Sequence, residues 1–280
     1  MYFLVADTET TGFSAAAGGR VVDIGLATVE WPAHHCEAIA APYSYYINPG
    51  IPIPPELSAV HHITDEDVTN APSWDSASAI VSGYARSVLG EDQFGDPLRF
   101  DYAVMHNSRF DEQWLTPAVI GGIPVIDTLR CARELWPDAP GHSNQVLRYW
   151  LESTGKMYAP YPIDKQIANM AHRAGPDAYV TAHIFRAMLQ FMWSVDHGGR
   201  PYDAPASELD IVNAPHVKLL CEWSSRPTLM HKINFGTHRG KNFKDVPVSY
   251  LSWIIENIRD KPDVLFTAKH YLEKATGARR

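Results

Sequence analysis

Residues 2–12 place two carboxylates at the end of an apolar run, and this stretch constrains the fold more than any other. The run 2–6 predicts a buried β-strand, and Asp7 and Glu9 follow it before a Thr-Thr-Gly turn. Side chains alternate along a strand, so both acids point to the same face of the sheet. Adjacent carboxylates repel, and one takes up a proton unless a cation lies between them. The pattern therefore favours a site for a hard divalent cation, although strands also commonly end in acids that only face water.

Two more acids stand in contexts that could complete such a site. Asp111 begins a predicted helix over 111–120, where an acid more commonly serves only the start of the helix. Asp177 falls in the first turn of a long helix predicted to begin at Pro176, and His172 precedes it in a loop. A lone histidine near a helix start is usually a surface residue. Four acids and one histidine in this order are harder to dismiss.

These five residues match the motifs of the DEDDh family of 3′→5′ exonucleases, which the chain resembles over nearly its whole length. Further segments that resemble this family lie at 47–49, 60–68 and 71–74. Segments 129–137, 143–144, 235–241, 250–254 and 269–273 resemble the exodeoxyribonuclease X branch of the family. The resemblance implies an α/β ribonuclease-H-like exonuclease fold, with a central mixed sheet flanked by helices and a small α+β C-terminal domain.

The resemblance also implies roles for the five residues. Asp7, Glu9 and Asp177 would hold one of two Mg²⁺ or Mn²⁺ ions, and Asp7 together with Asp111 would hold the other. His172 would act as the general base, since imidazole titrates near neutral pH. The implied reaction is hydrolysis of DNA from the 3′ end, with release of nucleoside 5′-monophosphates, in DNA repair or recombination.

Four further residues are candidates for substrate contact. Phe13 and His61 could pack on the terminal nucleotide, Asn107 could hydrogen-bond the backbone near the scissile phosphate, and Thr10 lies inside the first motif. Packing explains Phe13 nearly as well as substrate contact does. The sequence also departs from the family, because His62 stands where the wider family often has glycine.

The charge of the chain is unevenly distributed. The whole chain has a net charge of −8, but residues 216–280 carry 12 Lys and Arg against 6 Asp and Glu. Arg239 and Lys241 lie on a hairpin predicted over 231–243, where they could contact phosphate. We therefore expect a basic tail that binds DNA, at single-stranded or duplex 3′ ends. The alternative is that this basicity belongs to a solvated helical face.

Gly and Pro residues between 197 and 215 predict a boundary between two domains. The expected division is a catalytic domain at 1–197, a linker at 198–215 and a small basic domain at 216–280. Strands are expected at 2–6, 20–30, within 36–47 and at 102–105; helices are expected at 74–89, 111–120, 127–136, 144–152, 178–193, 219–223, 248–258 and 264–275.

The cysteines favour a cytoplasmic protein. Cys36, Cys131 and Cys221 are scattered and outside any C-x-x-C pattern, which predicts reduced thiols rather than disulfides or a zinc site. We also expect no signal peptide and no membrane-spanning segment.

Two other functions remain open from the sequence. The first is an exonuclease that acts on RNA, similar to oligoribonuclease or an RNA-trimming enzyme, because its catalytic motifs would be identical. The second is a non-catalytic module that binds nucleic acid or assists a polymerase. The presence of all four acids and the histidine weighs against this second function.

Overall fold

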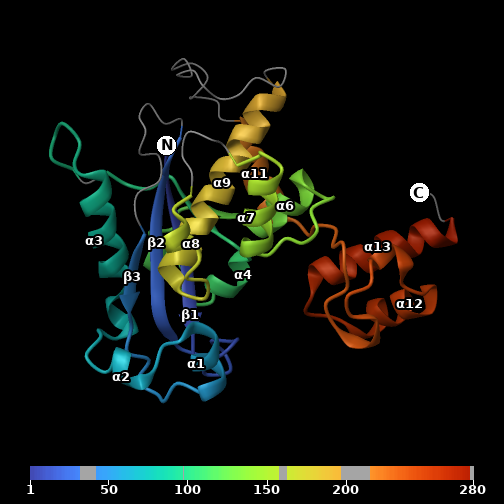
Figure 1. Cartoon of the computed structure of the whole chain (residues 1–280), viewed down its shortest axis with the longest axis horizontal. Coiled ribbons are helices and arrows are strands. Elements are labelled where there is room, and N and C mark those ends of the chain that lie inside the picture. Colours follow the sequence, from blue (N-terminus) through green and yellow to red (C-terminus); the bar gives the residue numbers. More distant parts are fainter. Residues whose placement is uncertain (32–41, 97, 158–162, 197–214, 278–280) are drawn as a thin grey trace.

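The computed structural model describes residues 1–31, 42–96, 98–157, 163–196 and 215–277, and its centre is a five-stranded mixed sheet (Figure 1). The strands are β1 (Tyr2–Thr10), β2 (Val21–Glu30), β3 (Tyr43–Tyr46), β4 (Tyr102–Met105) and β5 (Val125–Asp127). They lie in the order β3-β2-β1-β4-β5. The first three strands pair antiparallel, whereas β4 runs parallel to both β1 and β5. The predicted fold, a mixed sheet flanked by helices, is confirmed.

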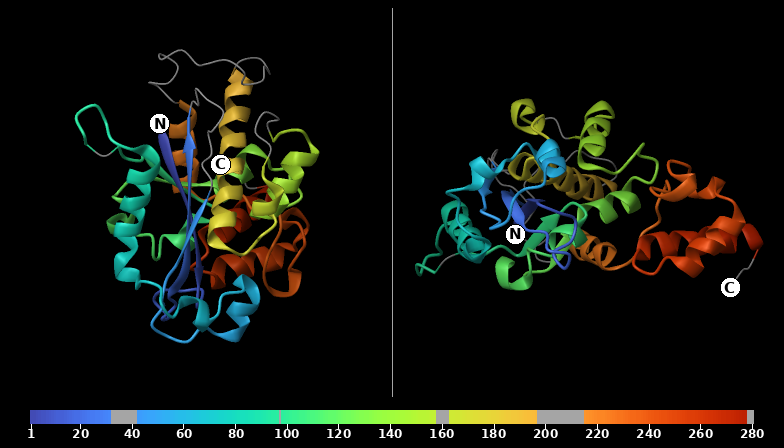
Figure 2. Two further views of the ribbon diagram at one scale, coloured as in Figure 1. Left: turned by 60° about the vertical axis from the view of Figure 1, so that its left-hand side comes forward. Right: turned by 90° about the horizontal axis from the view of Figure 1, so that it is seen from below.

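The central strand β1 has two apolar faces, each covered by a helix. Phe3 and Val5 belong to the core under α9 (Ala174–Asp196), whereas Leu4 and Ala6 belong to the core on the side of α3 (Ala77–Leu89). Figure 2 shows these two helices on opposite sides of the sheet. Because side chains alternate, Asp7 and Glu9 continue the face of Phe3 and Val5, so they lie on the side of α9.

Shorter helical segments surround the sheet and its two covering helices. They are α1 (Pro55–His61), α2 (Asp65–Val68), η1 (Trp74–Ser76), α4 (Ser108–Asp111), α5 (Pro117–Ile120), α6 (Thr128–Leu135), α7 (Asn144–Ser153), α8 (Lys165–Ala168) and α11 (Pro215–Ser225). Among the described helices, none is long and apolar enough to cross a membrane.

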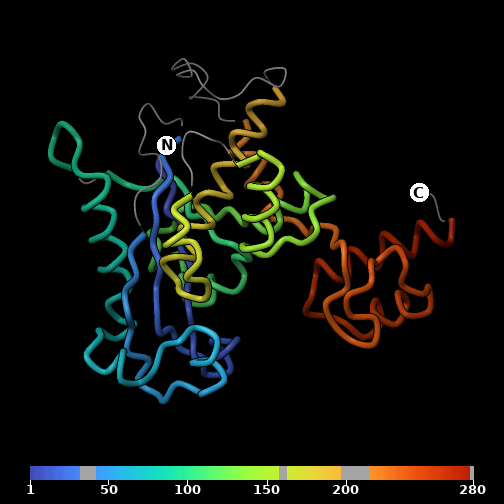
Figure 3. Tube along the Cα trace, in the orientation of Figure 1, coloured from blue at the N-terminus to red at the C-terminus, as the bar shows by residue number. Residues whose placement is uncertain are grey.

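The last part of the chain forms a small domain beside the larger one (Figure 3). It consists of η2 (Gly236–His238), η3 (Phe243–Asp245), α12 (Val248–Asn257) and α13 (Pro262–Thr276) around its own apolar core. In contrast, α11 packs on β5 and α6, and its Val217 and Leu220 belong to the larger core. The predicted linker lies almost wholly outside the described residues, so the proposed domain division stays a prediction.

Three predicted elements differ from the structure. The helix predicted over 111–120 is wrong, since α4 ends at Asp111 and α5 starts only at Pro117. A proline disfavours helical backbone at the residue before it, and Thr116 is accordingly extended. The long helix starts at Ala174, two residues before Pro176. The hairpin predicted over 231–243 has a single bridge between Lys232 and Asn242, and η2 occupies its tip.

Candidate active site

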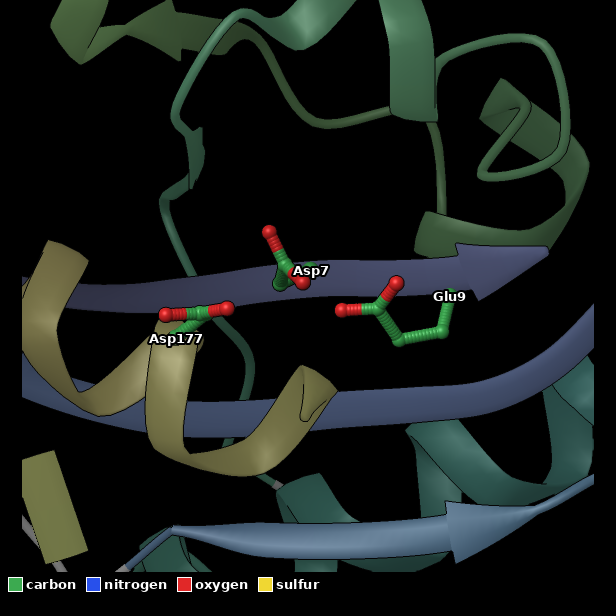
Figure 4. Close-up of side chains that lie close together, drawn as sticks. All are labelled: Asp7, Glu9 and Asp177. Carbon is green, nitrogen blue, oxygen red and sulfur yellow. The ribbon is translucent and has the colours of Figure 1, made fainter. Parts of the chain in front are cut away.

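Three carboxylates from two elements meet at one point. Asp7 and Glu9 come from the side of β1 that faces α9, and Asp177 comes from the first turn of α9 (Figure 4). One carboxylate oxygen of each lies within 4.8 Å of the others. The structure therefore brings together three of the four acids that the sequence singled out.

Two glycines allow the start of α9 to approach the sheet this closely. Gly25 of β2 pairs with Asp7 in the register of the sheet, and a Cβ atom at Gly25 would overlap the carbonyl group of Ala174. Similarly, a Cβ atom at Gly175 would overlap the hydroxyl of Ser44 on β3. The helix backbone thus rests directly on the two strands, which is what carries its first turn to the end of β1.

Asp23 also fixes the start of α9, and the sequence reasoning missed this residue. It is fully buried opposite Glu9, and its Oδ2 accepts the N–H of Ala174 at 3.3 Å and the Nε–H of Arg173 at 3.4 Å. Arg173 also donates to the hydroxyl of Tyr46 at 2.8 Å. A charged residue inside the apolar run 21–27 was the signal that could have revealed it.

Asp111 lies beside the cluster formed by Asp7, Glu9 and Asp177 but is not one of its three members. It ends α4, which follows β4, and it lines the same cleft. Its Oδ1 accepts the hydroxyl of Thr8 at 2.6 Å. Since β4 runs parallel to β1, the loop after β4 reaches the same edge of the sheet as the end of β1.

Burial and mutual repulsion make these carboxyl groups weak acids. Burial is the largest cause for each, and it raises the pKa of Glu9 to about 8 and that of Asp111 to about 7. The pKa of Asp7 is raised well above its ordinary value by burial and by the charges of Asp111, Asp177 and Glu9. Burial also raises the pKa of Asp177, against the opposing effect of the His172 N–H. The group is therefore costly to ionise without added positive charge.

This donor set fits a hard divalent cation. Carboxylate oxygens are the ligands that Mg²⁺ and Mn²⁺ prefer, and Asp7, Glu9 and Asp177 offer three of them in close proximity. A cation between them would remove the repulsion that raises their pKa values. The chemistry of the residues is thus compatible with the predicted metal site.

His172 stands at the rim of the acidic cluster. It is exposed, lines the cleft and has a left-handed backbone with φ of 62°. Its backbone N–H donates to Oδ2 of Asp177 at 2.8 Å, and its ring makes no hydrogen bond within the described part of the chain. A second histidine of the cleft, His106, is different: its ring nitrogens lie 2.9 Å from the hydroxyl of Thr128 and 2.8 Å from the carbonyl of His142. Of these two rings, that of His172 is the one without a hydrogen-bond partner in the described part of the chain.

The other predicted contact residues are scattered. Asn107 lines the cleft, with its N–H bound to Asp127 at 3.1 Å. Thr10 is buried and donates its hydroxyl to the Gly12 carbonyl at 2.8 Å, and His61 is only 1% exposed. Neither Thr10 nor His61 is among the residues that line the cleft.

Three predicted contacts lie on the surface. Phe13 is 80% exposed on the loop after β1, and Arg239 and Lys241 are exposed on the small domain; none of the three lines the cleft. His62, which follows α1, has a φ of 59°, the left-handed conformation that favours glycine, so the structure gives no reason for a histidine at this position.

The cleft has a volume of about 760 Å³, and part of its lining was not predicted. Arg133 of α6 lines it, as do Met230, Lys232 and Asn234 of the small domain. These residues lie far from the acids in sequence, so only the tertiary arrangement reveals them.

Comparisons with known proteins show which proteins this chain is similar to. The sequence profile of the Exonuclease family (RNase_T) matches residues 4–185. Exodeoxyribonuclease 10 of Escherichia coli K12 is 28% identical over 275 residues, which are 96% of this chain and 98% of that protein. DNA polymerase III subunit epsilon of Treponema pallidum is 29% identical over 67% of this chain and 76% of its own length. A solved structure of exonuclease X with 5′ overhanging duplex DNA is 26% identical over 69% of this chain and 95% of that chain, with a TM-score of 0.46.

Proposed function

The chain belongs to the Exonuclease family, and from this premise we propose that it hydrolyses DNA from the 3′ end and releases nucleoside 5′-monophosphates. The observation that carries the proposal is the convergence of Asp7, Glu9 and Asp177, with His172 bonded to Asp177 through its N–H. Such an arrangement places carboxylates and one base around a common cleft, as hydrolysis of a phosphodiester requires.

Asp7, Glu9 and Asp177 would hold one divalent cation, and Asp111 with Asp7 would hold a second. Two such ions would supply charge stabilisation for the attacking and leaving oxygens of an in-line displacement. The protein contributes the fixed positions of the carboxylates, which β1 and the first turn of α9 provide.

His172 would take the proton of the attacking water at a ring nitrogen. The water oxygen forms a bond to phosphorus while the bond to the 3′ oxygen breaks, and the 3′ oxygen leaves with a proton from solvent. The N–H bond to Asp177 ties the backbone of His172 to the acidic cluster but leaves the ring able to turn towards the substrate. Its exposure at the rim gives the ring access to solvent, to which it would return the proton.

Support for DNA as the substrate comes from the relative named Exodeoxyribonuclease 10, which matches 96% of this chain. The basic small domain, with Arg239 and Lys241 exposed, would add phosphate contacts outside the cleft. This activity would suit a role in DNA repair or recombination.

The proposal is tested with 5′-labelled DNA and RNA strands of equal sequence, in Mg²⁺ and in EDTA. We expect a ladder that shortens from the 3′ end of DNA only, that needs Mg²⁺, and that His172→Ala slows by a factor of about 10²–10⁴. His270→Ala, at an exposed histidine of α13, is the matched control and should cut at the wild-type rate. A ladder on RNA alone would keep the chemistry but refute the substrate, and intact binding without any cleavage would favour an accessory module.

A further inference from the structure

One wall of the catalytic cleft belongs to the small domain. Met230, Lys232 and Asn234 line the cleft that also contains the acidic cluster. The intervening Ile233 is 1% exposed and packs in the core of the small domain. Lys232 and Asn234 are exposed on either side of this buried residue, whereas Met230 is only 8% exposed and belongs both to the cleft lining and to the core of the small domain.

The segment is held in place by its own domain. The N–H of Ile233 donates to the Lys241 carbonyl at 2.9 Å, and the Ile233 carbonyl accepts the N–H of Gly240 at 2.7 Å. The N–H of Met230 donates to the hydroxyl of Thr267 on α13 at 2.9 Å. These bonds fix the backbone on both sides of Lys232, so its side chain starts from a fixed position at the cleft.

Ion pairs join this wall to the catalytic domain. Asp263 of α13 accepts from Arg130 at 3.1 Å and from Arg133 at 2.9 Å, and both arginines belong to α6. Asp263 also accepts the N–H of Thr228, just before the wall, at 3.4 Å. Because a carboxylate paired with two arginines, whose side chains are 4% and 13% exposed, has little freedom to move, the wall keeps a fixed position beside the acidic cluster.

The charges in the cleft give Lys232 a specific role. The acidic cluster repels a phosphodiester strand, so the part of the strand away from the cations needs positive charge from the protein. The cleft lining includes two permanently basic side chains, Arg133 and Lys232. Arg133 is paired with Asp263, whereas Lys232 is exposed and makes no ion pair with any residue that the structure describes. Its ammonium group is free to bind an anion.

We propose that Lys232, assisted by the side-chain amide of Asn234, holds a backbone phosphate of the substrate strand inside the catalytic cleft. This inference rests on the exonuclease function proposed above and deepens it, because it makes the small domain part of the active site. Lys232 is a positioning residue: it fixes the strand so that the 3′ end reaches the acidic cluster. Its role differs from that of Arg239 and Lys241, which lie outside the cleft.

The test compares Lys232→Gln with Lys165→Gln, which removes the same charge from an exposed site on α8, outside the cleft and outside the small domain. On a ten-nucleotide strand we expect Lys232→Gln to raise KM about five- to twentyfold and to change kcat less than about twofold. This rise in KM corresponds to the loss of one charged hydrogen bond to the substrate. The rise in KM should be smaller on a dinucleotide, and Lys232→Arg should restore most of the loss. Binding to single-stranded DNA should become less salt-dependent, with a slope shallower by about 0.7.

Three outcomes would overturn the inference. They are a KM of Lys232→Gln within twofold of wild type, a change in KM equal to that of Lys165→Gln, and an equal change in KM on the dinucleotide and on the long strand. Circular dichroism and thermal unfolding of Lys232→Gln establish that the variant is folded. A failure of the proposed function itself is distinguishable, because the wild-type protein would then cut neither substrate in Mg²⁺.

Discussion

Gly25 and Ala174 lie so close together that a single methyl group on Gly25 would overlap the carbonyl of Ala174. The contact joins the middle of β2 to the first residue of α9, and Asp177 stands three residues further along the helix. The position of one metal-ligand candidate therefore depends on the absence of a side chain on a neighbouring strand.

Gly25→Ala should accordingly damage both stability and activity. The added methyl group meets backbone atoms that have no rotamer to change, so α9 must shift away from the sheet. We expect a loss of about 2–3 kcal/mol in the free energy of unfolding by urea. The fall in kcat should be at least tenfold, because Asp177 moves with the helix.

Gly83→Ala is the matched control for this change. Gly83 is exposed within α3, and a Cβ atom there would meet nothing within 4 Å. The same methyl group should raise stability by about 0.5–1 kcal/mol, since alanine is the better helix former. If Gly25→Ala were as stable and as active as Gly83→Ala, the close approach of α9 would not position the site.

Asp7→Asn should stabilise the metal-free protein while it removes the response to metal. The raised pKa values of Glu9 and Asp111 mean that the folded state binds protons more tightly than the unfolded state, so metal-free stability falls as pH rises through 7 and 8. Removing one charge relieves the repulsion, and we expect a gain of about 1–2 kcal/mol at pH 8 in EDTA.

Thermal unfolding with Mn²⁺ completes this test. Mn²⁺ should raise the Tm of the wild-type protein and have little effect on Asp7→Asn, because a ligand stabilises only the state that binds it. Asp138→Asn, at an exposed acid outside the cleft, should respond to Mn²⁺ like the wild type. An equal rise in Tm for Asp7→Asn would mean that the stabilising ion binds elsewhere.

His183 should make the protein sensitive to acid. It is 6% exposed within α9, its Nε2 has no hydrogen-bond partner among the described residues, and burial lowers its pKa to about 3, with Arg186 and Arg148 adding to the effect. Between pH 6.5 and pH 3 the unfolded state binds a proton at this residue and the folded state does not. Stability due to this group is therefore lost as pH falls, by about 2 kcal/mol between pH 7 and pH 5.

His183→Phe should remove this loss and keep the aromatic contact with Tyr179, whose ring centroid lies 4.6 Å away. Urea unfolding at pH 7 and pH 5 measures the difference, and the carboxylates of the cleft are the same in both proteins. His270→Phe, at an exposed position, should keep the wild-type dependence on pH. Parallel curves for His183→Phe and the wild type would show that His183 is not kept neutral by the fold.

Local patterns were sufficient to predict most strands of the sheet and the shared face of Asp7 and Glu9. The alternation along 2–10 predicted that Asp7 and Glu9 share a face, and this prediction holds because β1 is buried on both sides. Short elements were harder: β5 has three residues, too few for a periodic pattern to show. Asp111 ends a helical turn rather than starting a helix, since the proline at 117 interrupts the segment.

Contacts between distant segments account for what the sequence did not reveal. The role of Gly25 depends on a helix that begins about 150 residues later, and a glycine within a strand is equally typical of a bulge or a tight bend. Lys232 was one of many basic residues in the tail until the fold placed it in the cleft. Periodicity reports which face of an element is buried but not which other element covers it.

Asp263→Asn should weaken the attachment of the small domain. Asp263 pairs with Arg130 and Arg133, whose side chains are 4% and 13% exposed. Arg130 would keep its ion pair with Asp127 at 3.7 Å, but Arg133 would lose the one carboxylate that it pairs with in the described part of the chain. We expect the unfolding free energy to fall by about 3 kcal/mol. KM on long DNA should also rise, since the wall that carries Lys232 is fixed through the same carboxylate.

Asp260→Asn, at an exposed acid just before α13, removes an equal charge and should melt within about 1 °C of the wild type. If both variants melted alike, the ion pairs with α6 would not hold the two domains together, and other contacts would have to keep Lys232 at the cleft.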